Sequence, residues 1–414
     1  MPNTWIISPT GDDITGTGTV LNPFKTLDGP TIGLGDTVLC RGGNYTFSYF
    51  NNAQNKFIYG TSEAERITIG AYESEVPVVV TGGSFQWQFK NDVKFFSIKN
   101  IFFDGVNQSF TSPDGLLKIY GDVTAKLPKN CVISGNTFQK GARENVQLFM
   151  GSNSTIENNT SIDAGRDPAS NTPNLFYITG NDLIVRKNKA IVNTNQMSRN
   201  FTGIRVYTNA GGMALKGPST NNIIEQNYVT HCTNGIVAGA GNNNIVRSNI
   251  VANQLYTGGN LIEIISQGSG GSTDNTKVYN NSLWGNGAGI GVWLFASGAT
   301  ITNTKIEGNI FHQLTTNVNI GSATGTTQVS NYTTDPLFIN QGGLNQEDYY
   351  LQATSGALNG APTLAEVPND IVGSIRPQGV GPDFGAYELP VSPPMGSGGL
   401  LSPQQPKIFH LGGI

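Results

Sequence analysis

The sequence is poor in charged residues and in long apolar segments. Lysine, arginine, aspartate and glutamate make up 13% of its 414 residues, about half the share usual in soluble proteins. The net charge is −4, and no basic stripe is present, so nothing indicates a nucleic-acid-binding protein. No apolar run is long enough to cross a membrane, and we expect no membrane span.

Cysteine and histidine are also scarce. The three cysteines, Cys40, Cys131 and Cys232, lie far apart, and an odd, scattered set does not form a disulfide framework. We therefore expect three buried thiols. The chain has three histidines, and their spacing predicts no zinc site. These residues lead us to expect no resident metal or other cofactor.

The beginning of the chain lacks the features of a secretory signal. Residues Met1 to Trp5 provide neither a basic start nor an apolar stretch. We expect either that a signal was removed or that the protein leaves the cell by another route, such as phage lysis.

Glycine, by contrast, is abundant, with 53 residues. Asparagine, threonine and serine fill the spaces between short apolar runs. Glycine and asparagine tolerate left-handed backbone conformations, so this mixture favours many strands joined by tight turns. It argues against helix bundles.

A short phrase recurs through the middle of the chain: an aliphatic residue, two variable residues and then asparagine. The intervals between these asparagines range from 22 to 39 residues, and repeats of this length indicate a solenoid. The longer intervals predict loops inserted into a coil. The repeated residues are Asn136, Asn159, Asn188, Asn227, Asn249, Asn281 and Asn309.

A second apolar run precedes most of these phrases, as at residues 146–150, 175–178, 261–265 and 290–295. The runs are too short for helices and are bounded by turn residues, so they predict strands. Parallel strands stacked coil on coil bury alternate side chains in a common core. We expect each repeated asparagine to lie at a bend, to bond neighbouring coils and to adopt left-handed geometry.

The two ends carry further motifs. Those at the start are Ser8 to Asp13, Asn22 to Leu27, Gly35 to Val38 and Gly43 to Tyr45; those near the end are Asp335 to Phe338, Asp370 to Gly373, Arg376-Pro377 and Asp383 to Glu388. With these motifs the chain resembles the pectate-lyase-like superfamily of right-handed parallel β-helices. The resemblance implies an all-β solenoid with four parts: an N-terminal cap (1–45), the β-helix (46–334), a closing module (335–389) and a linker with an apolar tail (390–414).

The resemblance also implies contact with long glycans, because such proteins include polysaccharide lyases, glycoside hydrolases, epimerases and trimeric phage tailspikes. Our first hypothesis is a tailspike-like or decoration-like protein of a phage particle that contacts bacterial surface polysaccharide. The second is a secreted, extracellular polysaccharide lyase or glycoside hydrolase. The third is a purely structural virion component. Folds host many functions, so the motifs alone do not choose among them.

A lyase needs a base and a cation that holds developing negative charge. Lyases resembling chondroitinase B use a lysine base and an arginine on neighbouring coils, often with Ca²⁺ on acidic ligands. Lys216 falls in a predicted strand, and Arg205 lies upstream. The next coil, at residues 235–239, offers no arginine. No acidic pair for calcium is evident, so we expect calcium only if the protein is a lyase.

A hydrolase needs two carboxylates across the scissile bond. The available acids are Asp163, Asp167, Asp182, Glu225 and Glu263. Glu225 lies within the repeated phrase, which favours a surface role. Glu263 lies between Ile262 and Ile264, so alternation points it outward. No pair stands out, and Glu263 joins Lys216 and Arg205 as a candidate catalytic residue.

The same alternation predicts a row of outward aromatic side chains, with Arg205 and Glu263 among them. Such a row indicates a glycan groove, a subunit interface or a surface covered by loops. We assign carbohydrate binding to five of these residues: Phe149, Tyr177, Tyr207, Trp293 and Phe295.

The composition changes after the closing module. Residues 393–399 are rich in proline and glycine, and the chain ends in an apolar peptide. We predict that Ile408, Phe409 and Leu411 dock on a partner, with a partner subunit favoured. We expect a homo-oligomer, in particular a trimer, or attachment to other virion proteins.

Overall fold

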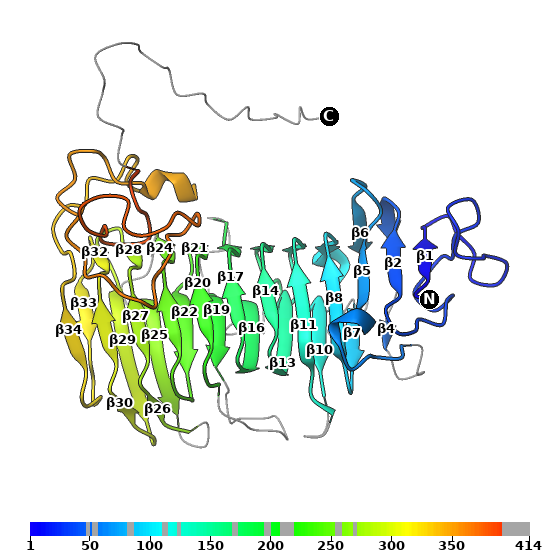
Figure 1. Ribbon diagram of the computed structural model, residues 1–414, viewed down its shortest axis with the longest axis horizontal. Coiled ribbons are helices and arrows are strands. Elements are labelled where there is room, and N and C mark those ends of the chain that lie inside the picture. Colours follow the sequence, from blue (N-terminus) through cyan, green and yellow to red (C-terminus); the bar gives the residue numbers. More distant parts are fainter. Residues whose placement is uncertain are drawn as a thin grey trace, which may run out of the picture.

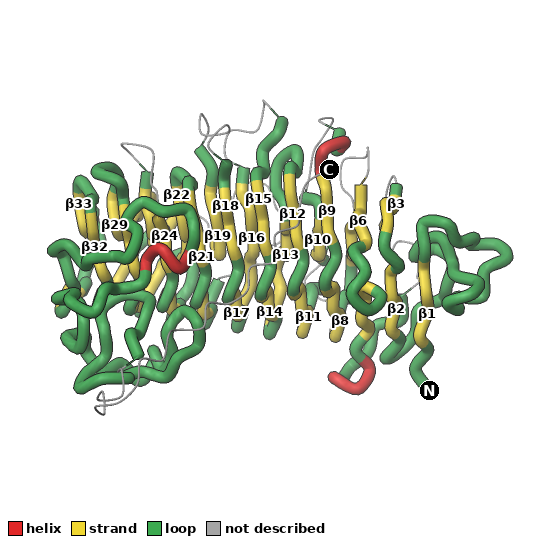
Figure 2. The backbone as a smooth tube through the Cα atoms, turned by 90° about the horizontal axis from the view of Figure 1, so that it is seen from above, coloured by secondary structure: helices red, strands yellow, loops and turns green. Residues whose placement is uncertain are grey.

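The computed structural model describes residues 1–46, 50–51, 57–80, 87–109, 115–121, 126–167, 173–193, 200–207, 219–252, 259–267 and 271–390. Their regular structure is almost entirely β-strand, interrupted by 3-10 turns such as Glu63–Glu65, Gly105–Asn107 and Gln346–Tyr349. The strands stack coil on coil along one axis (Figures 1 and 2). No helix in this part of the chain has the length and apolar character to cross a membrane.

Each full coil contributes strands to three parallel ladders. The front ladder consists of β4 (Phe50–Asn51), β7 (Trp87–Lys90), β10 (Leu117–Tyr120), β13 (Val146–Ser152), β16 (Asn174–Asn181), β19 (Thr202–Tyr207), β22 (Asn234–Gly239), β25 (Asn260–Gln267), β29 (Ile290–Ser297) and β33 (Thr316–Asn319). These strands include the longest among the described residues, β16, β25 and β29.

The middle ladder follows in each coil. It contains β1 (Thr4–Ile7), β2 (Thr37–Cys40), β5 (Ile67–Ala71), β8 (Lys94–Lys99), β11 (Lys129–Ser134), β14 (Thr155–Glu157), β17 (Ile184–Arg186), β20 (Ile223–Glu225), β23 (Ile245–Arg247), β27 (Lys277–Tyr279), β31 (Lys305–Glu307) and β34 (Thr327–Val329).

The back ladder completes the coil. It contains β3 (Gly43–Tyr45), β6 (Pro77–Val80), β9 (Phe102–Asp104), β12 (Thr137–Gln139), β15 (Thr160–Ile162), β18 (Lys189–Ile191), β21 (Tyr228–Thr230), β24 (Ile250–Ala252), β28 (Ser282–Trp284) and β32 (Ile310–His312). A separate parallel pair, β26 (Thr273–Asp274) and β30 (Ile301–Thr302), follows the front-ladder strands β25 and β29 in two successive coils. Every strand pairing in the three ladders is parallel, as the repeat predicted.

Alternate side chains point into a single core that runs along the axis. On the front ladder, one fully buried column consists of Phe176, Ile204, Ile236, Ile262 and Val292. Cys40, Cys131 and Cys232 are buried free thiols, as expected, and burial raises the pKa of Cys131 to about 12. The intervening residues of the front ladder therefore point away from the core.

The repeated asparagines form a continuous internal ladder. The Oδ1 of Asn249 accepts from both the backbone N–H and the Nδ2 of Asn227 at 2.9 Å. The Nδ2 of Asn249 donates to the carbonyl of Ile224 and to Oδ1 of Asn281. The expected left-handed geometry lies one position earlier, as at Ser248 with φ 50°. The structural interpretation is confirmed, with this correction.

The solenoid also begins earlier than expected. β1 pairs in register with β2, and β2 pairs with β5, so strands of the middle ladder start at Thr4 rather than after residue 45. The segment around Gly18 and Phe24 forms the cap proper, because it bonds the outer edge of β1. The end of the first strand, Ile6-Ile7, is apolar and buried, which explains why this short segment joins the core.

The closing module, residues 335–389, folds back along the flank of the solenoid (Figure 1). Its apolar residues cover outward side chains of the back ladder, including Tyr228 and Trp284. A buried ion pair holds the module together: Arg376 lies 2.9 Å from Glu388, and both side chains are almost fully buried. Arg376 also donates to the carbonyls of Asp383 and Gly385.

Candidate functional site

One outward column on the front ladder brings together four of the eight residues expected at the site: Tyr177, Arg205, Glu263 and Trp293. Successive strands place Gln147, Tyr177, Arg205, Val237, Glu263 and Trp293 in register. Neighbouring strands in a sheet are about 4.8 Å apart, so the column advances by that distance per coil. Arg205 and Glu263 are separated by one small residue, Val237.

Arg205 lies between two tyrosine rings. The centre of its guanidinium is 5.0 Å from the ring of Tyr177 and 5.1 Å from the ring of Tyr207. Its Nε is buried and has no hydrogen-bond partner among the described residues. Contacts with two aromatic faces stabilise a cation without neutralising it. The guanidinium can therefore donate to an anionic group that arrives from solvent.

Glu263 is a strongly perturbed carboxyl on this face. Its side chain is 6% exposed, and burial raises its pKa from 4.5 to about 7. The positive charge of Arg205 and a hydrogen bond with Asn260 act in the opposite direction. A carboxyl with a pKa near neutrality can accept and return a proton at physiological pH.

We expect this burial to make folding stability pH-dependent. In the unfolded chain Glu263 loses its proton near pH 4.5, whereas the folded protein retains it up to about pH 7. The folded state therefore loses stability as pH rises through that window, by up to about 3 kcal/mol at roughly 1.36 kcal/mol per unit. The Glu263→Gln variant should lack this loss. Urea unfolding at pH 4.5 and pH 7.5 would measure it, and parallel curves for the two proteins would contradict the buried-carboxyl assignment.

A polar row accompanies the column at the start of the same strands and was not predicted from the sequence. Asn260 donates to Oδ1 of Asn234 at 3.4 Å. Asn174 donates to Glu144, whose buried carboxylate also accepts from Gln147. A pattern in the sequence could have predicted this row, because an asparagine stands three residues before each of Tyr177, Val237 and Glu263. This second asparagine repeat places amide groups beside the outward column.

The aromatic residues of the face fall into two groups. Tyr177, Trp293 and Phe295 are partly exposed, and the rings of Trp293 and Phe295 are 4.7 Å apart. Phe149 and Tyr207 also lie on the outward side, as predicted, but both are buried, which does not suit their assignment to carbohydrate binding. Tyr207 packs in an outer apolar cluster with Val237 and Ile265, separate from the main core. Phe149 meets Tyr177 edge to face at 5.0 Å.

The remaining candidates lie elsewhere. Lys216 belongs to residues 208–218, outside the described part of the chain. Glu225 forms an ion pair with Arg247 on the middle ladder, with 2.8 Å between its Oε2 and the arginine Nε, in keeping with a surface role. Asp182 accepts from Asn221. The described residues bring no three histidine, cysteine, aspartate or glutamate side chains together in a metal-binding group.

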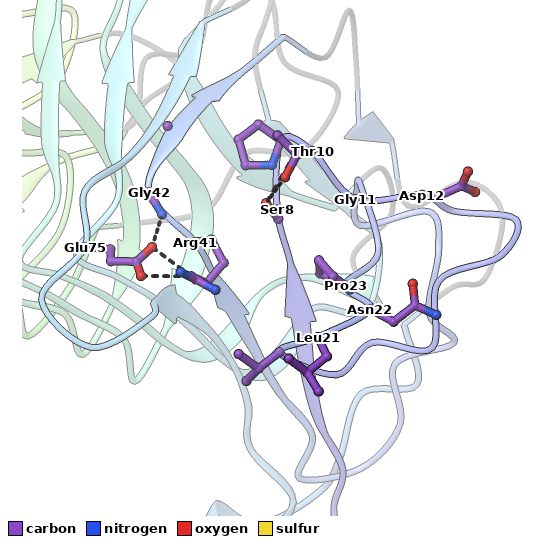
Figure 3. A pocket seen from close by; sticks show the side chains of 13 residues that line it. Ser8, Thr10, Gly11, Asp12, Leu21, Asn22, Pro23, Arg41, Gly42 and Glu75 are labelled. Carbon is purple, nitrogen blue, oxygen red and sulfur yellow. Dashed lines mark hydrogen bonds and ion pairs between the residues drawn. The ribbon is translucent and has the colours of Figure 1, made fainter.

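A hollow of about 610 Å³ lies at the N-terminal cap (Figure 3). Its charged residues are already engaged: Arg41 lies 2.8 Å from Glu75, and Glu75 accepts from the backbone N–H of Gly42. Leu21 and Pro23 form the opposite wall. The front ladder, with its perturbed carboxyl and its half-buried cation, is therefore the stronger candidate site.

Comparison with known proteins agrees with the architecture. The profile of the family described as "Right handed beta helix region" matches residues 129–306. The fold is a right-handed parallel β-helix. A search of curated proteins finds no match.

Two solved structures share the fold across nearly the whole chain. The crystal structure of pectate lyase Pel9A gives a TM-score of 0.60 at 13% sequence identity, covering 94% of this chain and 96% of that one. The complex of XylC with xylose gives a TM-score of 0.53 at 10% identity, covering 93% and 98%. At these identities the likeness establishes the β-helix fold.

Proposed function

We propose that the front ladder binds an acidic polysaccharide and that Glu263 and Arg205 act on it. The observation that carries the proposal is the buried carboxyl of Glu263, which has a pKa near 7 and lies two coils beyond Arg205. The β-helix relatives named above include a pectate lyase and a protein solved with xylose, which supports a carbohydrate as the ligand. In this site Arg205 binds the acidic group of the sugar, and Trp293 with Phe295 offers a platform for sugar rings.

The geometry favours elimination over hydrolysis. A glycoside hydrolase places its two carboxyl groups within about 5–9.5 Å of each other. The described residues place two further buried carboxylates near this face, Glu144 and Asp167, whose N–H donates to the carbonyl of Ala142. Glu144 precedes β13, four strand spacings from β25, and is thus about 19 Å from Glu263 at roughly 4.8 Å per spacing. Elimination needs one base and one cation for the sugar carboxylate, and Glu263 and Arg205 provide these two groups.

The reaction balances without a further reactant. Glu263, ionised, takes the proton beside the sugar carboxylate, and the electron pair of that C–H bond forms a carbon–carbon double bond. The bond to the leaving glycosyl oxygen breaks, and that oxygen takes up the proton from Glu263, directly or through water, which returns Glu263 to its ionised form. Arg205 stabilises the negative charge that accumulates on the carboxylate in the transition state. The products are a shortened chain and an unsaturated end.

Arg205 provides a test of the substrate class. Replacing it with methionine keeps a long side chain between the tyrosine rings but removes the charge, so we expect binding of acidic polysaccharides to weaken by about 1.5–3 kcal/mol, the contribution of a charged hydrogen bond. Binding of a neutral polysaccharide of similar length should change little. Calorimetric titration against a panel of acidic and neutral polysaccharides, with products analysed for unsaturated ends, measures both. Equal losses for acidic and neutral chains would contradict the assignment.

Attachment to a phage particle, recognition of bacterial surface polysaccharide and assembly as a trimer stay predictions from the sequence, as does calcium binding. A depolymerising activity located on a particle would join the virion hypothesis to the enzymatic one. The same activity in culture medium would favour the secreted enzyme.

A further inference from the structure

The hollow at the N-terminal cap continues along the bend between the middle and back ladders. A second hollow, of about 330 Å³, adjoins it, because Glu75 lines both. Together they form a groove past the ends of β1, β2, β5, β8 and β11, which pair in that order. These five strands span four spacings, or about 19 Å at roughly 4.8 Å each. A groove of this length suits a short chain of several units.

Arg41 keeps hydrogen-bond donors for a ligand in this groove (Figure 3). Its ion pair with Glu75 uses Nε, which donates to the two carboxylate oxygens at 2.8 and 2.9 Å. Neither of its terminal Nη groups donates to another residue in the described part of the chain. The side chain is 34% exposed, and its guanidinium centre lies 4.9 Å from the ring of Tyr72, which holds it in place. The Nη donors are therefore accessible and fixed in position.

The groove also offers acceptors and further donors. Glu75 is partly exposed, and its bonds with Arg41 and with the backbone N–H of Gly42 hold its pKa below the usual range, so it is an ionised acceptor. Thr10 contributes an exposed hydroxyl. Asn100 is exposed too, and its amide has no hydrogen-bond partner among the residues that the structure describes. Mixed donors and acceptors suit hydroxyl groups, each of which both donates and accepts.

The bend has the same left-handed turns in every coil, but the closing module covers only those near the C-terminal end. There, Asn280 Nδ2 donates to the carbonyl of Asp383 in the module. In the groove, Asn100 has φ 58° and Gly135, its neighbour in the next coil, has φ 67°. A Cβ at Gly135 would lie 2.2 Å from Oδ1 of Asn100, so the glycine leaves room for this amide. Among the described residues, the module makes no bond with either turn.

We propose that this groove binds a neutral oligosaccharide that spans both hollows, at a site separate from the front ladder. Three carboxylates, those of Asp12, Glu73 and Glu75, line it against one guanidinium, so an acidic glycan is repelled. Leu21 and Pro23 form an apolar wall for the C–H groups of a sugar ring. A peptide cannot add as a strand here, because β2, β5 and β8 are each paired on both sides.

Calorimetric titration of the full-length chain tests the site. The wild type is screened against neutral oligosaccharides of glucose, galactose, mannose and xylose, and the tightest binder is titrated into Arg41→Gln. Loss of the Nη donors should raise Kd by at least about tenfold. The matched control is Arg186→Gln, because Arg186 also donates through Nε to a glutamate, Glu157, at 2.8 Å but lies outside the groove. It should bind as tightly as the wild type.

Two results of this titration would overturn the proposal. One is a wild type that binds none of the neutral oligosaccharides. The other is an Arg41→Gln variant, shown by circular dichroism to be folded, whose affinity equals that of the wild type or falls no further than that of Arg186→Gln.

A second pair of variants examines the other end of the groove and leaves every ion pair intact. Asn100→Ala removes the amide that lines the groove. Asn158→Ala removes an exposed amide at the same bend two coils on, from a residue with φ 55°. Both substitutions replace a left-handed asparagine, so their effects on stability should match, whereas only Asn100→Ala should weaken binding, by about fivefold. Equal affinities in the two variants would overturn the proposed span of both hollows.

The other predicted binding surfaces are independent of this groove. The docking peptide predicted at Ile408, Phe409 and Leu411 lies outside the described residues. Arg41→Gln should leave the binding of an acidic polysaccharide unchanged, and Arg205→Met should leave the binding of the neutral oligosaccharide unchanged. The two carbohydrate sites can therefore fail separately. Loss of neutral binding in Arg205→Met but not in Arg41→Gln would place the neutral sugar on the front ladder and overturn the proposal.

Discussion

Replacing Glu263 with glutamine is expected to lower the turnover of an acidic polysaccharide by about 10²–10⁴-fold, the usual contribution of general acid–base catalysis. The substitution preserves the size of the side chain and its bond with Asn260, but it removes the group that exchanges a proton near pH 7. Substrate affinity should change far less than turnover, since Arg205 and the aromatic rings remain. Initial rates of formation of unsaturated ends, over a range of substrate concentrations, separate the two effects.

The pH dependence of kcat/KM shows whether Glu263 acts as a base or as a proton donor. A base must be ionised, so kcat/KM should rise about tenfold per pH unit below pH 7 and level off above it. The control is Glu225→Gln, because that carboxylate pairs with Arg247 on the middle ladder and lies away from the site; its activity should match the wild type. An active Glu263→Gln enzyme would exclude Glu263 as the base, and a rate that falls as pH rises through 7 would indicate a proton donor instead.

The sequence contains most of the information needed to predict the coils. Strand alternation is local, so the flanking isoleucines alone placed Glu263 on the outer face. The repeated asparagines predicted both the coil period and the internal ladder. The start of the solenoid was misplaced because β1 lies in a segment without the asparagine phrase, and only pairing with β2, over thirty residues later, includes it in the ladder.

The site was predicted less completely than the fold. Tyr177, Arg205 and Glu263 fall in one column because the coils are in register, which alternation within single strands suggested. Burial on the outer face depends on contacts between coils, so the sequence did not reveal that Phe149 and Tyr207 are buried there. The pKa of Glu263 also follows from that burial, which its outward position in the strand did not reveal.

A substitution that breaks the internal asparagine ladder is expected to cause the largest loss of stability. In Asn249→Leu, the fully buried amide is replaced by an apolar side chain of similar size. The backbone N–H and Nδ2 of Asn227 lose their acceptor, and the carbonyl of Ile224 loses a donor. Each unsatisfied buried group costs about 1–3 kcal/mol, so the free energy of unfolding should fall by about 3 kcal/mol or more. Urea unfolding followed by circular dichroism measures the change.

An asparagine-to-leucine substitution at an exposed position is the control, because it shows how leucine affects stability when no ladder bond is lost. Asn317 lies on β33 with its side chain exposed, so Asn317→Leu should change the free energy of unfolding by no more than about 0.5 kcal/mol. The loss in Asn249→Leu should also leave the front ladder intact, because Asn249 lies at the bend between β23 and β24. Binding of an acidic polysaccharide at a temperature where the variant is folded should therefore be preserved. If Asn249→Leu unfolds with the stability of the wild type, the asparagine amides do not hold the coils together, and stability must come from the apolar columns.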